Sequence, residues 1–142
     1  MRLSKERGLV CCGQSPWCVK IFAMSLWKIA YIFKEGVAGR RVVWFQKDLE
    51  SVRDGVGHNA HPEVGSHIAV VRKAVEHPDD VREDVGHAKR RCYYTWFGGD
   101  TVYPSGYMKV VVKENWRGKL NVLTAYFMQS MKSSEKSIWK KT

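Results

Sequence analysis

Runs of β-forming residues alternate with short glycine-containing breaks in the C-terminal half of the chain, and this alternation constrains the fold most. The runs are residues 89–97, 107–113 and 120–128. Gly98-Gly99-Asp100 separates the first two runs, and residues 114–119 form a glycine-containing break between the last two. We therefore expect three strands joined as an antiparallel meander. Val110-Val111-Val112 is a continuous apolar run, which is typical of a central strand covered on both sides, with a helix on one face.

Two helices are expected before the meander. Residues 47–53 form a short polar stretch with helical character, and Gly55 and Gly57 end it. A second helix is expected from Pro62, because proline at the first turn suits its missing amide donor. Its apolar residues are spaced by four, three and four, and they are Val64, Ile68, Val71 and Val75. We expect this stripe to face the valine strand and to form the main core with Leu123, and we expect the helix to end near Pro78-Asp79.

The order of elements predicts the fold class. Residues 26–33 and 41–45 read as strands, helices follow, and the meander comes last, so an α+β domain is expected. A chain of 142 residues is one domain in length. We expect residues 1–23 to be a loose N-terminal extension and residues 24–142 to form the single domain.

The cysteines and the N-terminus indicate a protein of the cytoplasm. Cys11, Cys12 and Cys18 lie close together but include no CxxC pair, so structural zinc is not expected. Four cysteines, counting Cys92, are too few for a small disulfide scaffold, and reduced thiols are expected. The N-terminal region has no unbroken apolar stretch of signal-peptide type, and the apolar residues 17–33 are too few to cross a bilayer. We expect no metal, no cofactor and no membrane partner.

The charge of the chain points to an anionic partner. The formal net charge is +10, and it is unevenly placed: residues 1–45 carry +6, residues 46–88 carry −4 and residues 89–142 carry +8. Basic residues alternate with aromatic ones in the last segment, where Arg90, Arg91 and Lys109 are expected to contact phosphate. This mixture predicts a nucleic-acid surface, although a solvated basic surface without a partner is the simpler alternative.

Few residues could support catalysis. The sequence has no glycine-rich phosphate loop, no GxSxG and no HExxH motif. His61 and Glu63 lie at the start of the second helix, and Thr124 and Tyr126 share one face of the last strand of the meander. An imidazole or carboxylate with hydroxyls and cations suits metal-independent RNA cleavage, which needs a base, an acid and groups that hold the phosphorane. A histidine before proline is also a common turn residue, and threonine is a common strand residue.

An ordered set of short motifs resembles a known nuclease family. The motifs are His61-Pro62-Glu63, Pro78-Asp79, Arg91-Cys92-Tyr93-Tyr94, Val110-Val111-Val112 and Thr124-Ala125-Tyr126. In this order they resemble the phage-associated members of the barnase/EndoU/colicin/RelE-like fold, over roughly residues 42–139. The usual pattern of this family has a tryptophan before the HPE motif, and here residues 55–60 lengthen the spacing between the two. The family also has a histidine before that motif, and Gln46 and Lys47 stand near its place.

The resemblance implies an α+β fold in which N-terminal helices pack on a four-stranded antiparallel sheet. It also implies a ribonuclease of toxin or phage-effector type, with His61, Thr124 and Tyr126 at the positions of the motif residues. RNA is the implied partner, and an acidic antitoxin or immunity protein is a candidate protein partner. Because this fold also has members that only bind, a non-catalytic nucleic-acid-binding domain and a structural domain with incidental basicity stay open.

Overall fold

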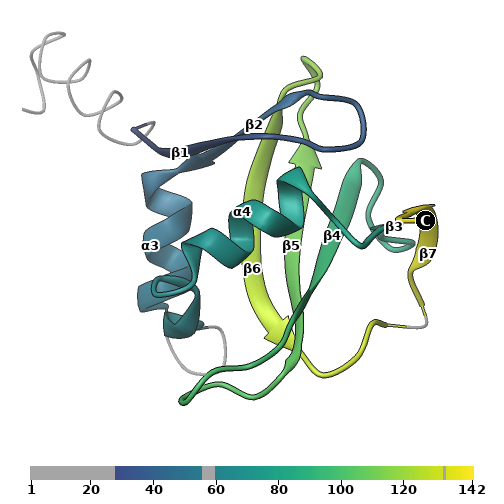
Figure 1. Ribbon diagram of the computed structural model, residues 1–142. Helices are drawn as coiled ribbons and strands as arrows, with labels where there is room; N and C mark the ends of the chain where they lie inside the picture. The colour runs from purple at the N-terminus through teal and green to yellow at the C-terminus, as the bar shows by residue number, and fades with distance from the viewer. Residues whose placement is uncertain (1–27, 56–59, 133) are drawn as a thin grey trace, which may run out of the picture.

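The computed structural model describes residues 28–55, 60–132 and 134–142, which form one seven-stranded sheet with two α-helices and a 3-10 turn (Figure 1). In chain order the elements are β1 (Ile29–Lys34), β2 (Arg41–Phe45), α3 (Gln46–Asp54), η2 (Pro62–Val64), α4 (Ile68–Glu76), β3 (Asp80–Glu83), β4 (Arg90–Phe97), β5 (Gly106–Glu114), β6 (Leu120–Met128) and β7 (Lys136–Lys140). The expected N-terminal extension and the cysteine cluster, Cys11, Cys12 and Cys18, lie outside the described residues.

The sheet is mixed, with strand order β1-β2-β6-β5-β4-β3-β7. All neighbouring strands are antiparallel except β2 and β6, which pair in parallel through Val42 with Leu120 and Val43 with Asn121. The expected fold, N-terminal helices on a four-stranded antiparallel sheet, is therefore wrong. The meander of β4, β5 and β6 is present, but the sheet has seven strands and the chain reaches its first helix only after the β1–β2 hairpin.

Two short strands that the sequence did not indicate complete one side of the sheet. β3 and β7 pair with each other, and β3 also pairs with β4. Both strands are mainly polar, but Val81 of β3 is buried and Trp139 of β7 packs against the main core. Asp80 is also buried, and its carboxylate accepts a hydrogen bond from Ser137 Oγ at 2.7 Å and pairs with Arg82 Nε at 3.1 Å.

The apolar stripe packs on the sheet as expected, but the single helix expected from Pro62 is wrong, because η2 (Pro62–Val64) and α4 (Ile68–Glu76) are separate elements and Val64 lies in η2. Val64, Val71 and Val75 are fully buried in one core with Val110 and Val112, and Ile68 is partly buried against it. β5 is the central strand of the sheet, which agrees with its continuous valine run. Both helices contribute to this core, since Leu49 and Val52 of α3 are buried in it too.

Leu123 does not belong to the main core, because β6 contains a bulge. Val111 pairs with Thr124, whereas the next residue, Val112, pairs with Val122, so Leu123 is the extra residue on β6. The bulge turns Leu123 to the other face of the sheet, where it packs with Cys92, Tyr94 and Val111. The side chains on the helical face are Leu120, Val122, Ala125 and Phe127, so the parity of the strand changes at the bulge.

The β1–β2 hairpin is fastened to α4 by a close backbone contact. Gly36 N donates a hydrogen bond to Val75 O at 3.0 Å, and a Cβ at Gly36 would lie 2.1 Å from Glu76 O. Only glycine allows this approach. The preceding residue, Glu35, is fully buried and accepts a hydrogen bond from Tyr93 Oη at 2.7 Å. These contacts fix the hairpin beside the helix and the centre of the sheet.

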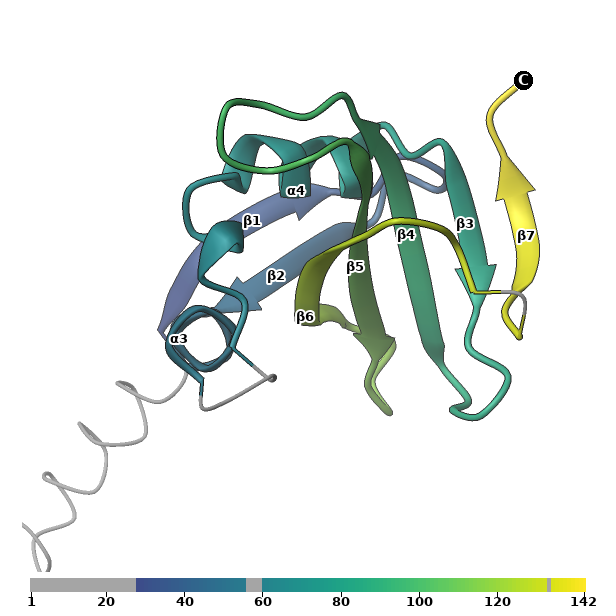
Figure 2. The ribbon, with the colours of Figure 1, turned by 90° about the horizontal axis from the view of Figure 1, so that it is seen from below.

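The face of the sheet away from α4 is partly covered by the segment between β6 and β7. We call residues 129–132 and 134–135 the C-terminal strap. Figure 2 shows the chain after β6 crossing in front of β5 and β4 to reach β7. Met131 of the strap packs on the smaller apolar cluster of Cys92, Tyr94 and Val111, and Glu135 at the end of the strap is buried. The remaining part of this face, over β2 and β6, carries two of the surface hollows described below.

Candidate active site

Backbone hydrogen bonds hold His61 between α3 and η2. His61 N donates to Val52 O at 2.7 Å, and His61 O accepts from Val64 N at 3.1 Å. Pro62 occupies the first position of η2, where its missing N–H costs nothing. The histidine is therefore placed by the end of one helix and the start of the next turn, at the edge of β6.

The imidazole of His61 stacks on the ring of Tyr126. The two ring centroids are 5.0 Å apart and the planes differ by 22°. His61 Nδ1 lies 3.5 Å from Glu63 Oε2, and the His61 side chain is 26% exposed. A proton on Nδ1 faces the carboxylate, which leaves Nε2 as the nitrogen with a free lone pair. Among the described residues, Nε2 has no hydrogen-bond partner.

Thr124 and Tyr126 join His61 in one surface hollow of about 680 Å³. Its walls are Ser51, Val52 and Gly55 from α3 and its end, His61, and Leu123, Thr124 and Tyr126 from β6. We call this the His61 hollow. The bulge directs Leu123 and Thr124 to the same side of β6, so both side chains line this hollow opposite α3. The structure thus brings together His61, Thr124 and Tyr126, three of the four residues expected to be catalytic, and the fourth, Glu63, contacts His61 without lining the hollow.

Lys109 does not lie on an exposed basic surface, contrary to expectation. It is almost fully buried, and its Nζ lies 2.5 Å from Glu135 Oε2 of the C-terminal strap. Tyr94 Oη donates to the other oxygen of the same carboxylate, and Cys92 Sγ lies 3.7 Å from Oε2. Burial alone would lower the pKa of Lys109, but the hydrogen bond and charge of Glu135 outweigh it and raise the pKa. The ammonium is neutralised inside the protein, 5.7 Å from the Tyr126 ring centroid.

Arg90 and Arg91 lie elsewhere. As neighbours on β4 they point to opposite faces of the sheet, and both contribute to a hollow of about 360 Å³ near the β3–β4 turn. This hollow also contains the acidic residues Glu83, Asp84 and Glu114. The single concave basic surface expected from Arg90, Arg91 and Lys109 is therefore not formed.

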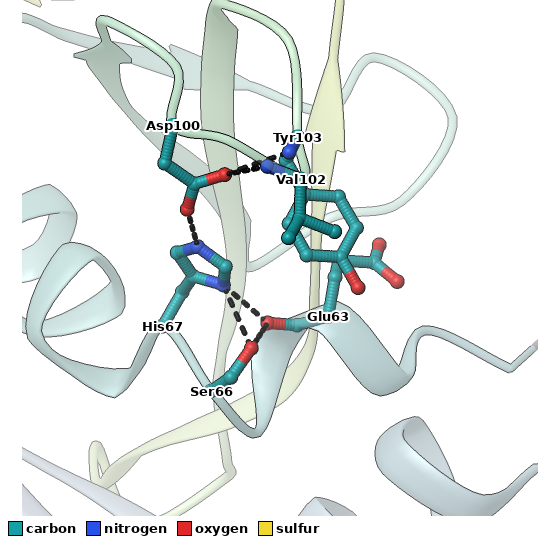
Figure 3. Close-up of polar contacts among 6 residues, drawn as sticks. All are labelled: Glu63, Ser66, His67, Asp100, Val102 and Tyr103. Atoms are coloured by element: carbon teal, nitrogen blue, oxygen red, sulfur yellow. Dashed lines mark hydrogen bonds and ion pairs between the residues drawn. The ribbon is translucent and has the colours of Figure 1, made fainter.

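His67 has a structural role that the sequence did not indicate. Its Nε2 lies 2.8 Å from Asp100 Oδ2 and its Nδ1 lies 2.7 Å from Glu63 O, so both nitrogens face acceptors (Figure 3). Burial lowers the pKa of His67, but the hydrogen bonds that its ring nitrogens donate to Asp100 and to Glu63 O outweigh this and raise the pKa above 6.5. The rings of Phe97, Tyr103 and Phe127 enclose the imidazole edge to face.

The Asp100 carboxylate is held as firmly as its partner. Backbone N–H groups of Tyr103 and Val102 donate to Oδ1 at 2.7 and 2.9 Å, and together with His67 they lower the pKa of Asp100 to about 2. The pair fastens the β4–β5 loop to the start of α4. Local sequence patterns do not reveal this pair, because Asp100 lies 33 residues from His67 along the chain.

Comparison with known proteins identifies no relative of this chain. No family model, curated protein or solved structure matches the chain. The resemblance to barnase/RelE-like nucleases therefore stays a prediction that rests on the motifs. Within the described residues, no three His, Cys, Asp or Glu side chains are grouped so that they could hold a metal ion, and no helix has the length and hydropathy of a membrane span.

Proposed function

We propose that the protein is a small ribonuclease that cleaves RNA through the ribose 2′-OH in the His61 hollow, without a metal ion. The observation that carries this proposal is the meeting of His61 with Thr124 and Tyr126, which are more than 60 positions away in sequence, in one open hollow. An imidazole and two hydroxyls around a space of this size match the needs of phosphodiester transesterification.

In the proposed reaction His61 Nε2 removes the proton of the ribose 2′-OH. The 2′-oxygen attacks the adjacent phosphorus, and the bond from phosphorus to the 5′-oxygen breaks. Water donates a proton to the leaving 5′-oxygen and His61 releases the proton it removed to water, so the products are a 2′,3′-cyclic phosphate and a 5′-OH. Glu63, 3.5 Å from Nδ1, orients the imidazole. The hydroxyls of Thr124 and Tyr126 hydrogen-bond the phosphate oxygens on which charge develops.

Binding without cleavage is the second candidate function. It is favoured by the walls of the His61 hollow, because no lysine or arginine is among the described residues that line it. A ribonuclease would then depend on hydroxyl donors and on cations that bind the RNA outside the hollow. We place either activity in the cytoplasm, where RNA is available, and an acidic antitoxin or immunity protein stays a candidate partner.

Incubation of the full chain with total RNA in EDTA tests the proposal. We expect fragments with 2′,3′-cyclic phosphate ends. Replacing His61 with Ala should reduce the cleavage rate by about 100-fold or more, since general acid–base groups contribute roughly 10² to 10⁴. His77→Ala is the matched control, because His77 is an exposed histidine at the end of α4, away from the hollow.

Thr124→Val tests the phosphate contact with almost no change in shape. Loss of one such donor should reduce cleavage by on the order of 100-fold while the unfolding curve stays close to that of the wild type. Substantial cleavage by both the His61 and the Thr124 variants would exclude this hollow as the active site. Retained RNA binding without any cleavage by the wild type would leave the binding function in its place.

A further inference from the structure

We propose that the substrate of the His61 hollow is single-stranded nucleic acid, and that it binds along a second groove at the β5–β6 turn, where Trp116 stacks on a base. The groove is a hollow of about 440 Å³ between the start of β2 and the β5–β6 turn, with Arg41, Val43, Phe45, Lys119 and Asn121 among its walls. We call it the Arg41 groove. This inference rests on the proposed function, but its test separates the two.

Trp116 is the most exposed large hydrophobic side chain among the described residues, at 81%. The guanidinium of Arg117 lies 4.7 Å from its ring centroid and covers one side of the indole. The other side is open to solvent. An aromatic ring with one free face and a cation beside it is the arrangement that stacks on an unpaired base, and it does so regardless of base identity.

The turn that carries Trp116 is held by its own hydrogen bonds. Asn115 Oδ1 accepts from Arg117 N and from Lys119 N, both at 2.9 Å. Gly118, with a φ of +78°, donates its N–H to Asn115 O at 2.9 Å. The positive φ favours glycine at this position. Because the turn is already ordered, a ligand that stacks on Trp116 loses little conformational entropy in the protein.

The cations of the groove are available for phosphate. Within the described part of the chain, no carboxylate lies within ion-pair distance of Arg41 or Lys119, whereas Arg40 next to them pairs with Glu114 at 3.5 Å. Val43 and Phe45 supply an apolar surface between these cations. Two unpaired cations beside apolar and aromatic surface can bind the backbone and the bases of one strand at once. A duplex would keep its bases paired and could not stack on Trp116 in this way.

β6 connects the Arg41 groove to the His61 hollow. Asn121 borders the groove, and Thr124 lines the hollow, three residues further along the same strand. At about 3.3 Å per residue the two positions are separated by roughly 10 Å. A strand of a few nucleotides can therefore contact the turn, the groove and the hollow together. This arrangement also supplies the cations that the walls of the His61 hollow lack.

Fluorescence anisotropy of a labelled single-stranded oligo-2′-deoxyuridine with the full chain tests the groove. This probe has no 2′-OH, so it binds without being cleaved by the proposed reaction. Trp116→Ala should weaken binding by about 5- to 150-fold, the range for loss of one stacked base. Arg41→Ala with Lys119→Ala should reduce the slope of log K against log salt by about 1.4, since each phosphate contact on a single strand contributes about 0.7.

Lys73→Ala with Lys140→Ala is the matched control. It removes the same charge from exposed positions on α4 and β7, and it should change the salt slope much less. Binding by the groove variants at wild-type strength, equal affinity for a duplex of the same length, or no binding of the probe at low salt would each overturn the inference.

The outcomes also separate this inference from the proposed function. If the groove variants lose affinity as expected but His61→Ala still cleaves RNA, the groove stands and the assignment of the active site fails. If His61→Ala abolishes cleavage while Trp116→Ala leaves both probe affinity and the KM for RNA unchanged, the active site stands and the groove fails.

Discussion

The two faces of the sheet differ in chemistry, and the difference separates stability from function. The face toward α4 buries one continuous apolar core, which includes Trp44, Met108, Val71 and Val75 of α4, and Val110 and Val112 of β5. The opposite face has a much smaller apolar cluster, beside which the charges of Lys109 and Glu135 are buried together. The Arg41 groove and the His61 hollow also lie on this second face, because Val43, Leu123 and Thr124 point away from the main core.

The helices cover one side of the sheet and leave the other side for polar contacts. Apolar burial against α4 supplies a non-directional driving force, at about 25 cal/mol per Å². The other face depends on directed contacts, which the C-terminal strap completes by bringing Glu135 to Lys109 and Tyr94. Directed contacts fail more sharply when one partner is lost, so substitutions on the two faces should differ in size.

The largest effect is expected from Glu135→Ala. This change leaves Lys109 buried without its carboxylate and Tyr94 Oη without its acceptor, and it should lower the free energy of unfolding by about 3–5 kcal/mol. Urea unfolding monitored by circular dichroism measures it. The double variant Glu135→Leu with Lys109→Met removes both charges and should recover much of the loss. A loss below about 1 kcal/mol for Glu135→Ala would contradict the importance of the strap.

An intermediate effect is expected from alanine substitutions of one valine on each face. Val71 is 0% exposed in the main core, and Val111 is 8% exposed in the smaller cluster. Val71→Ala should cost about 2 kcal/mol, from roughly 0.8 kcal/mol for each lost methyl plus a cavity contribution. Val111→Ala should cost about half of this, because flexible side chains such as Met131 can fill the space. Equal losses would show that the two faces are packed alike.

The smallest effect is expected for the pH dependence of stability that arises from the contact between His67 and Asp100. The pKa of His67 is raised above 6.5, so its contribution to stability is complete below 6.5 and is lost as the pH rises through the higher folded value. The pKa of Asp100 is lowered from 3.8 to about 2, so its contribution is present above 3.8 and is lost as the pH falls toward 2.

Comparison of the wild type with Asp100→Asn at several pH values isolates this contact. The difference in the free energy of unfolding between the two proteins should be greatest between pH 3.8 and 6.5 and should shrink on both sides of that range. The remaining titrating groups are common to both proteins. A difference that does not change with pH would mean that the charge of His67 does not contribute to stability.

Much of the local structure follows from the sequence. The sequence predicts the meander of β4, β5 and β6, because the period of a strand depends only on neighbouring residues. It predicts the buried stripe of Val64, Val71 and Val75 for the same reason. The shared face of Thr124 and Tyr126 was predictable for the same reason. β3 and β7 were not, because their sequences are polar and they become strands only by pairing at the edge of an existing sheet.

The candidate site was only partly predictable. The residues His61, Thr124 and Tyr126 have suitable chemical types, but the sequence does not place a histidine after α3 against a strand that begins nearly 60 residues later. Lys109 was wrongly expected on a basic surface, because its partner Glu135 lies 26 residues away and reaches it only through the strap. The cations of the Arg41 groove were likewise brought together by the β1–β2 hairpin and the β5–β6 turn.

Local sequence was enough to indicate the β4–β5–β6 meander and the apolar stripe of α4, since those properties depend on the order of residues over a few positions. Tertiary contacts were needed for the rest: the edge strands β3 and β7, the parallel pairing of β2 with β6, the parity change at Leu123, the burial of Lys109 and the stacking of His61 on Tyr126. Each of these is a contact between distant segments, and its free energy depends on the burial and hydrogen bonding that the assembled sheet provides.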